Sequence, residues 1–537
     1  MTFTVSTDTA KLVQLVTEMQ LNLCICIRHF LTQRGPAHTF ATNMFQRFGM
    51  PLSSVRQKGL NEVLAAPVRG LASLIKTPAA TARKAVTLTC AAALVLPVLI
   101  SPAHAQRKLP LVRDAEVEGL LRDYAKPIFR VAGIGSSEPT IILVNDKTFN
   151  AFVPDSRRMF INIGVILEAE TPGEVIGVLA HETGHIAGRH LVRMRAAASN
   201  AQIMSVIAMI LGAGAAAAGA ASGSGSATSG GAAAIVGAGS LGQRSFLAYR
   251  RSEEAAADRA ALRYLDQTGQ SARGLLRNFQ RMAEQQIFSK QFADPYAISH
   301  PMAQDRFNGL LREAQESKYF NKPEDYVLQH RHDMAKAKLF AFTSHPSATL
   351  RAYPRKDKSL PAQYARAIAA MQSRGKGAVD EIDKLIRQHP TNPYFHELKG
   401  QALLEGGDPK NAIAPFRRAL SIRPNETQFM VWLGYALVAS DNPANLAEAE
   451  SVLKRAIQRD SNSGTAYAQL AIAHGRQGER AEADLATAKG LMVRGEFEAA
   501  KRYAARAQKS LNRGSAAWLQ ADDIVAYKPP SVPGQRR

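Results

Sequence analysis

The sequence predicts two folded parts: an α+β domain, mostly helical with a small sheet, and then an all-α superhelix of repeated helix pairs. Three observations predict this order. An apolar, helix-forming run ends in two histidines four residues apart, and short β-prone stretches precede it. The last third of the chain shows self-similarity with a period of 34 residues. We therefore expect the first domain at 107–345, the repeats at 346–515 and a disordered tail at 516–537.

The first 105 residues are expected to lie outside both domains. Residues 76–105 have the pattern of a secretory signal peptide: basic residues, an apolar run, and then Ala103-His104-Ala105 as a cleavage site. A transmembrane anchor is the alternative, but the apolar run is short and contains Pro97, which favours cleavage. A signal so far into the chain indicates that residues 1–75 are disordered, that the assigned start is too early, or that they form an organelle transit region.

Composition limits the function classes. The net charge of +22 over 537 residues favours contact with anionic surfaces such as lipid head groups or acidic unfolded chains. We find no nucleic-acid-binding motif and expect no nucleic acid partner. Cys24, Cys26 and Cys90 all precede the expected cleavage site, so a mature chain would have neither a disulfide nor a thiol nucleophile. This is compatible with an oxidising compartment.

The first domain should begin with a helix and a small sheet. Residues 114–130 form an amphipathic pattern typical of a helix, and residues 140–145, 149–153 and 159–165 are predicted strands. The edge strand of such a sheet could hold an extended peptide by backbone pairing.

The sequence His181-Glu182-Thr183-Gly184-His185 has the pattern H-E-x-x-H. On a helix, its two histidines share one face and can reach one zinc ion, while Glu182 can take a proton from an attacking water. The S/T-x-x-E pattern from Thr171 to Glu174 predicts the helix start, with Pro172 in the first turn. The alternative is two histidines on an ordinary helix. Because the preceding run is apolar nearly all round, that alternative would bury three polar groups that need partners, so we favour the metal.

A catalytic zinc needs a third protein ligand. The metzincin pattern would place a histidine at position 191, but that residue is Leu191, and His190 is one position short. Glu254 is the best candidate, with Asp258 one turn later accepting a hydrogen bond from a ligand histidine. A solvated acidic patch at a helix N-terminus is the alternative, and we expect Glu253 to fit it.

H-E-x-x-H followed by E-x-x-x-D resembles peptidase family M48. Asn145-Asp146, Met159 to Gly164, and His300-Pro301 followed by Arg306 also resemble that family. With the C-terminal repeats, the chain is similar to the periplasmic M48 proteases that carry tetratricopeptide repeats.

The resemblance implies a zincin-like metalloprotease domain followed by a tetratricopeptide-repeat superhelix. It implies one Zn²⁺ per chain on His181, His185 and Glu254, with Glu182 as the general base. The implied substrates are misfolded or stalled outer-membrane β-barrel proteins, and the repeats would contact the barrel-assembly machinery. The implied location is the periplasm, with association with the outer membrane as a further possibility.

Two rival functions stay open. One is a periplasmic chaperone or assembly scaffold that acts mainly through its repeats. The other is an organelle quality-control protease, which would require the N-terminal segment to be a transit peptide.

Two further features of the sequence, one segment and one histidine, can each be interpreted in two ways. Residues 201–242 begin apolar and continue as Ala, Gly and Ser, which predicts a helical hairpin with a flexible tip, or else a membrane-surface element or a lid. His300 could occupy the fourth zinc position as a latch in a resting state, although a lone loop histidine is more often exposed or hydrogen-bonded. We expect Arg306 to anchor structure through a salt bridge.

The repeat domain is predicted from the regular spacing of matching residues. Pro390 and Pro424 lie 34 residues apart, and Trp432-Leu433-Gly434-Tyr435 is typical of the first tetratricopeptide helix. The sequence predicts three to four repeats plus a partial helix pair at 497–511. Such arrays expose a concave groove for extended peptides or partner helices.

Overall fold

The structure, a computed structural model, describes residues 109–197, 199, 248–288, 300, 304–373 and 377–529. All of these fall within one compact unit, Lys108–Arg537. The predicted signal peptide, the cysteines and segment 201–242 lie outside the described residues. Among the described helices, none has both the length and the apolar character needed to cross a bilayer.

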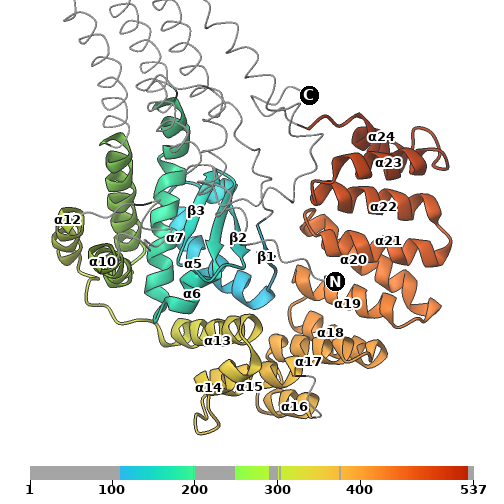
Figure 1. Ribbon diagram of the computed structural model, residues 1–537, viewed down its shortest axis with the longest axis horizontal. Helices are drawn as coiled ribbons and strands as arrows, with labels where there is room; N and C mark the ends of the chain where they lie inside the picture. The colour runs from blue at the N-terminus through green and yellow to red at the C-terminus, as the bar shows by residue number, and fades with distance from the viewer. Residues whose placement is uncertain are drawn as a thin grey trace, which may run out of the picture. The chain divides into compact units, whose positions relative to one another are not determined.

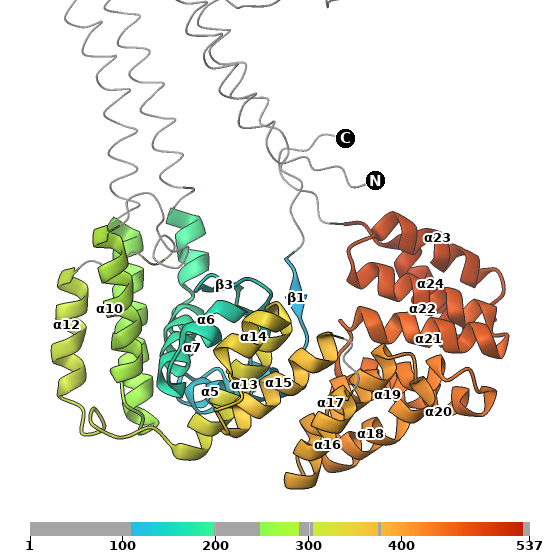
Figure 2. The same cartoon turned by 60° about the horizontal axis from the view of Figure 1, so that its bottom comes forward.

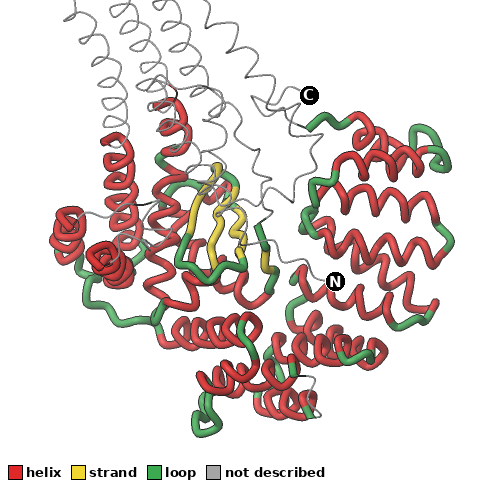
Figure 3. Tube along the Cα trace, viewed as in Figure 1, coloured by secondary structure: helices red, strands yellow, loops and turns green. Residues whose placement is uncertain are grey.

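The described residues form a four-stranded sheet in the N-terminal part, with the strand order β1-β2-β4-β3. Its strands are drawn in yellow in Figure 3. Strand β1 is antiparallel to β2, β2 is parallel to β4, and β3 is antiparallel to β4. The last strand, β3, therefore forms one edge, and it contacts helix α7. The strands are β1 (Leu111–Val112), β2 (Thr140–Val144), β3 (Ala151–Asp155) and β4 (Arg158–Asn162).

Helices surround this sheet and share one hydrophobic core with it. Helix α5 contacts β2 and α7, and α7 packs on α10. Figures 1 and 2 both show α12 beside α10. The helices are α5 (Ala115–Val131), α6 (Ile163–Glu168), α7 (Pro172–Ala187), α10 (Arg273–Phe288) and α12 (Gln304–Gln315), with the 3₁₀ turn η1 (Gly135–Ser137); residues 190–197 and 248–267 are also helical.

The predicted helix and strands are present, with two local corrections. The strand expected at 159–165 ends at Asn162, and the chain continues as α6. A short apolar run fits a strand or a buried helix equally well, and here the run divides between the two. The predicted capping box is also wrong. Thr171 is the N-cap of α7 but makes no capping hydrogen bond, and its hydroxyl accepts one from Arg277 Nη2 at 2.5 Å.

The C-terminal part consists of antiparallel helix pairs in which each helix packs on the next; Figure 1 shows α21 to α24 side by side. Gly434, in the predicted first-helix motif, lies against Leu453 of the following helix. The pairs are α15 (Leu360–Gln372) with α16 (Ala378–Gln388), α17 (Pro393–Glu405) with α18 (Pro409–Ile422), α19 (Thr427–Ala439) with α20 (Leu446–Arg459), α21 (Gly464–Gln477) with α22 (Arg480–Val493), and α23 (Phe497–Gln508) with α24 (Ala516–Ala526). The 3₁₀ turn η2 (Pro443–Asn445) precedes α20.

The predicted disordered tail at 516–537 is wrong for its first part. Residues Ala516–Ala526 form α24, whose Ala521 and Ile524 are buried against the preceding helices. Ser515 caps this helix by accepting a hydrogen bond from the backbone of Trp518. The partial helix pair expected at 497–511 is therefore a complete pair.

Helix α13 (Tyr326–Thr343) lies between the two parts, because it contacts α5, α6 and α7 as well as α15. The short α14 (Pro346–Ala352) follows it. The side chain of Lys338 on α13 is 2% exposed and lies 2.8 Å from Asp114, 3.5 Å from Glu116 and 3.3 Å from Glu397. This buried cluster joins both predicted domains, and the division near residue 345 stays a prediction.

Candidate metal centre

Helix α7 is buried from Pro172 to Ile186, as its apolar sequence predicts. Within it His181 and Glu182 are fully buried and His185 is 9% exposed. The two histidines are one helical turn apart, and their Nε2 atoms lie 3.1 Å from each other. The motif therefore presents two imidazole nitrogens to one point inside the domain.

The helix at 248–267 supplies the carboxylates. A Cβ atom added to Gly184 would lie 2.9 Å from the backbone oxygen of Ala257, so the absence of a side chain at 184 lets the two helices approach closely. Glu254 then reaches both histidines, at 3.4 Å from His181 and 3.6 Å from His185. Asp258 lies on the other side of the first ring, with its Oδ1 2.9 Å from His181 Nδ1.

His300 completes the group. Its Nδ1 lies 3.2 Å from His181 Nε2 and 2.8 Å from Glu254 Oε2, and its Nε2 lies 3.6 Å from Glu182 Oε1. The structure thus brings together all six predicted site residues. The side chain of Arg306 lies outside the described residues.

The donor set fits a tetrahedral metal. Ligands at about 2.1 Å from a tetrahedral zinc lie about 3.4 Å from one another. The candidate donor atoms of His181, His185, Glu254 and His300 all lie within 4.8 Å of one another, and all four residues are buried. Two or three imidazoles with one carboxylate are typical zinc ligands. These residues could therefore hold a divalent metal ion.

The electrostatics of the group also favour a cation. Burial opposes a charge on His181, but its hydrogen bonds with Asp258 and Glu254 outweigh burial and raise its pKa to about 10. Burial lowers the pKa of His185 to about 3, with His181 and His300 adding to this effect. Burial alone would raise the pKa of Glu254, yet the three neighbouring histidines hold it well below its usual range. An ionised Glu254 among these imidazole nitrogens is a favourable place for a divalent ion.

The prediction that Glu253 belongs to a solvated acidic patch is wrong. Its side chain is 8% exposed, lies 3.2 Å from His190 Nε2 and pairs with Arg193 at 2.7 Å. The spacing to Asp258 separates Glu254 from Glu253 in the sequence, but it does not show whether the Glu253 side chain is buried, because only the tertiary packing decides that. The one available signal is His190, which lies close to the motif without fitting the metzincin spacing.

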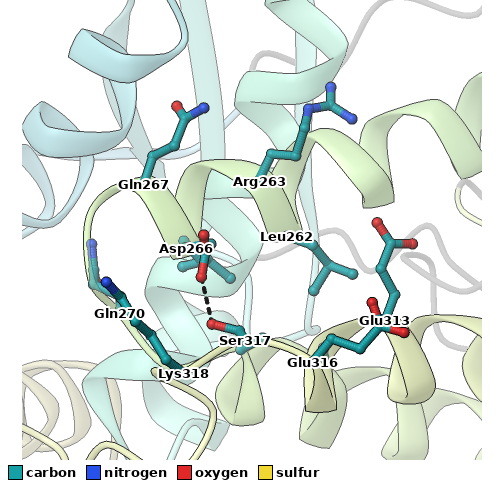
Figure 4. A pocket seen from close by; sticks show the side chains of 12 residues that line it. Leu262, Arg263, Asp266, Gln267, Gln270, Glu313, Glu316, Ser317 and Lys318 are labelled. Carbon is teal, nitrogen blue, oxygen red and sulfur yellow. Dashed lines mark hydrogen bonds between the residues drawn. The ribbon is translucent and has the colours of Figure 1, made fainter.

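A separate surface cavity of about 460 Å³ lies between the helix at 248–267 and the end of α12 (Figure 4). It is lined by Arg263, Asp266, Glu313 and Lys318 among others, and Ser317 donates a hydrogen bond to Asp266 at 2.5 Å. None of the candidate metal ligands lines this cavity, so it is not part of the metal centre.

An H-E-x-x-H helix with a glutamate from a second helix beside it defines the class of metal-dependent peptidases. The comparison with known families is more specific. Residues 112–314 match peptidase family M48, so the chain carries an M48 peptidase domain.

Curated relatives are similar over longer stretches. The putative beta-barrel assembly-enhancing protease of Vibrio cholerae is 23% identical over 300 residues, which cover 53% of this chain and 58% of the relative. The beta-barrel assembly-enhancing protease of Escherichia coli K12 is 21% identical over 420 residues, covering 76% of this chain and 82% of the relative. A solved structure titled "Crystal structure of MamA" covers 29% of this chain at 20% identity with a TM-score of 0.24, which is too low to carry any argument.

Proposed function

We propose that this chain is a zinc-dependent endopeptidase of the periplasm that degrades misfolded or stalled outer-membrane β-barrel proteins and supports their assembly. The observation that carries the proposal is the buried four-donor group with Glu182 beside it. The names of the relatives support the choice of substrate. The signal-peptide pattern at 76–105 supports the choice of compartment. By this proposal the repeats contact the barrel-assembly machinery, and segment 201–242 makes a peripheral membrane contact.

In the proposed reaction His181, His185 and Glu254 hold the metal, which when bound supplies Lewis-acid polarisation of the scissile carbonyl. Glu182 accepts a proton from the attacking water and then passes it to the leaving amine nitrogen. Asp258 accepts a hydrogen bond from His181 Nδ1, which leaves the Nε2 lone pair of that ring for the metal. The fully buried position of Glu182 keeps bulk water away from the proton that it carries.

Strand β3 is the natural place for the substrate. It forms one edge of the sheet and contacts α7, which carries the motif. An unfolded segment can pair with an edge strand through its backbone, so recognition depends on conformation more than on sequence. This suits a protease that acts on unfolded chains.

The substrate proposal is tested with one β-barrel protein in two states. The full-length chain should cleave the urea-unfolded barrel protein after dilution, and it should leave the same protein intact once folded in detergent micelles. An unfolded soluble protein of similar length serves as the control for selectivity. If the unfolded barrel protein is kept soluble but is not cut, the rival chaperone function is correct and the endopeptidase proposal fails.

His300 is proposed to act as a latch on the metal. A catalytic zinc keeps one coordination position open, whereas a fourth protein donor closes the tetrahedron. The position of His300 Nδ1, 2.8 Å from Glu254, supports this proposal. His300→Ala should therefore raise the rate of cleavage, by about 10-fold if about one molecule in ten is open in the unmodified chain. An unchanged or abolished rate, measured at equal zinc content, would show that His300 is not a latch.

A further inference from the structure

We propose that His190 and Glu253 form a hydrogen-bonded support that fixes the orientation and tautomer of His185 for metal binding. This inference rests on the proposed metal site and adds two positioning residues to it. It is carried by three features of the structure: the two facing ring nitrogens, the carboxylate behind them, and the backbone turn that brings His190 back against the motif helix.

The two rings of His185 and His190 meet through matching atoms. Nε2 of His185 faces His181, whereas its Nδ1 lies 3.0 Å from Nδ1 of His190. Two facing ring nitrogens form a hydrogen bond only when one of them carries the hydrogen. If Nε2 of His185 keeps its lone pair for the metal, its Nδ1 carries the hydrogen and donates to His190. The contact alone lets either ring donate, and the carboxylate behind His190 decides the direction.

The carboxylate behind His190 selects the tautomer of that ring in turn. A carboxylate can only accept, so His190 Nε2 carries the hydrogen and donates to Glu253 Oε2 at 3.2 Å. The Nδ1 of the neutral His190 ring is then the acceptor, and His185 Nδ1 donates to it, which leaves His185 Nε2 free for the metal. Arg193 donates to both oxygens of Glu253, at 2.7 and 3.3 Å, and Tyr249 also hydrogen-bonds this carboxylate. A continuous chain of hydrogen bonds thus runs from the half-exposed Arg193 to the metal-facing ring of His185.

The backbone between the motif and His190 is shaped for this contact. Helix α7 ends at Ala187, and Arg189 has a φ of +52°, in the left-handed region. Residues other than glycine adopt this conformation rarely, because their Cβ comes close to the following carbonyl oxygen. At Gly188 an added Cβ would lie 2.1 Å from Nε2 of His190, so only glycine leaves space for the ring. The sequence Gly188-Arg189-His190 therefore turns the chain back sharply and places the imidazole behind His185.

The two proposed ligand histidines are then supported in parallel ways. His181 Nδ1 donates directly to the buried Asp258, whereas His185 reaches its carboxylate through a second imidazole. The neutral ring of His190 fixes the orientation of His185. It places less negative charge beside that ring than a carboxylate in direct contact would. The two ligands are thus supported with different strengths.

The test measures zinc affinity in the full-length chain by competition with a chromophoric zinc chelator. His190→Leu removes the acceptor and should weaken zinc binding by about 10- to 100-fold. His190→Asn should recover part of the loss, because its side-chain oxygen can still accept from His185. Glu253→Gln keeps an acceptor for His190 Nε2 and should cost less than about 10-fold.

His396→Leu is the matched control. His396 is also a buried histidine on a helix, with its Nε2 2.9 Å from the backbone oxygen of Pro390, but it lies in the repeats and outside the groups of possible metal ligands among the described residues. The control variant should lose thermal stability without any change in zinc affinity. The inference is overturned if His190→Leu behaves like this control. Should that variant fail to fold, an unchanged zinc affinity of Gly188→Ala, whose added Cβ would displace the His190 ring, would overturn it. No zinc binding by the unmodified chain would instead overturn the proposed function.

Discussion

Glu182→Gln should reduce the rate of peptide-bond cleavage by about 10²- to 10⁴-fold, which is the usual contribution of a general base. Glutamine has nearly the same size and shape as glutamate, so the fully buried position should accommodate it. Glu182 is not one of the four grouped donors, and we therefore expect zinc content and affinity to be unchanged. Single-turnover cleavage of a fluorescent unfolded substrate measures the rate, and metal analysis measures the zinc.

Glu448→Gln gives the matched control for that exchange. Glu448 lies on α20 in an exposed pair with Arg417, so its replacement should change neither the rate nor the zinc content. A Glu182→Gln chain that cleaves at the unmodified rate with full zinc content would show that another group carries the proton. The general-base role would then be wrong even though the metal site is correct.

Lys338→Met should lower the free energy of unfolding by about 3–5 kcal/mol, because it leaves buried carboxylates without their cation. Lys338 is the shared partner of Asp114, Glu116 and Glu397, and its side chain is 2% exposed. Lys399→Met is the control, since Lys399 pairs with Asp383 at 2.7 Å in a partly exposed position and should cost about 1 kcal/mol or less. Urea unfolding of both variants measures the difference.

The loss in Lys338→Met should depend on pH. Burial raises the pKa of Glu116 to about 6 and that of Glu397 to about 7. A carboxyl group with a raised pKa in the folded chain contributes stability below its unfolded pKa of 4.5, and that contribution is lost as the pH rises through the folded value. Near pH 5 both groups are largely protonated and need Lys338 less, so the loss should be smaller there than at pH 8. An equal loss at both pH values would contradict this account of the cluster.

The parts of the site that could be predicted from the sequence are those that depend on short-range helical spacing. His181 and His185 are one turn apart on one helix, as are Glu254 and Asp258 on another, and the structure places both pairs as their spacing indicates. The meeting of the motif helix with the helix of Glu254 is predicted by the need of a catalytic zinc for a third protein ligand, and the family resemblance agrees with it. The close approach at Gly184 gives the physical reason for it.

The features that sequence reasoning missed depend on tertiary packing. Glu253 looks like any acidic residue in a first turn, and only the chain reversal at Arg189 brings His190 against it. Lys338 lies in an Ala-rich helix where a solvated lysine is the usual expectation, yet acidic residues from α5 and α17 enclose it. In both places a polar group is buried because partners distant in the sequence compensate for the cost of removing it from water.

The central claim is that a metal held by the α7 motif and Glu254 is required for peptide-bond cleavage. The most direct test measures cleavage of an unfolded outer-membrane β-barrel protein by the full-length chain in three states: with its zinc, after removal of zinc by a chelator, and after stoichiometric zinc is restored. We predict cleavage, loss of cleavage, and full recovery, with Glu254→Gln failing to recover. Cleavage that persists in the zinc-free chain would contradict the account.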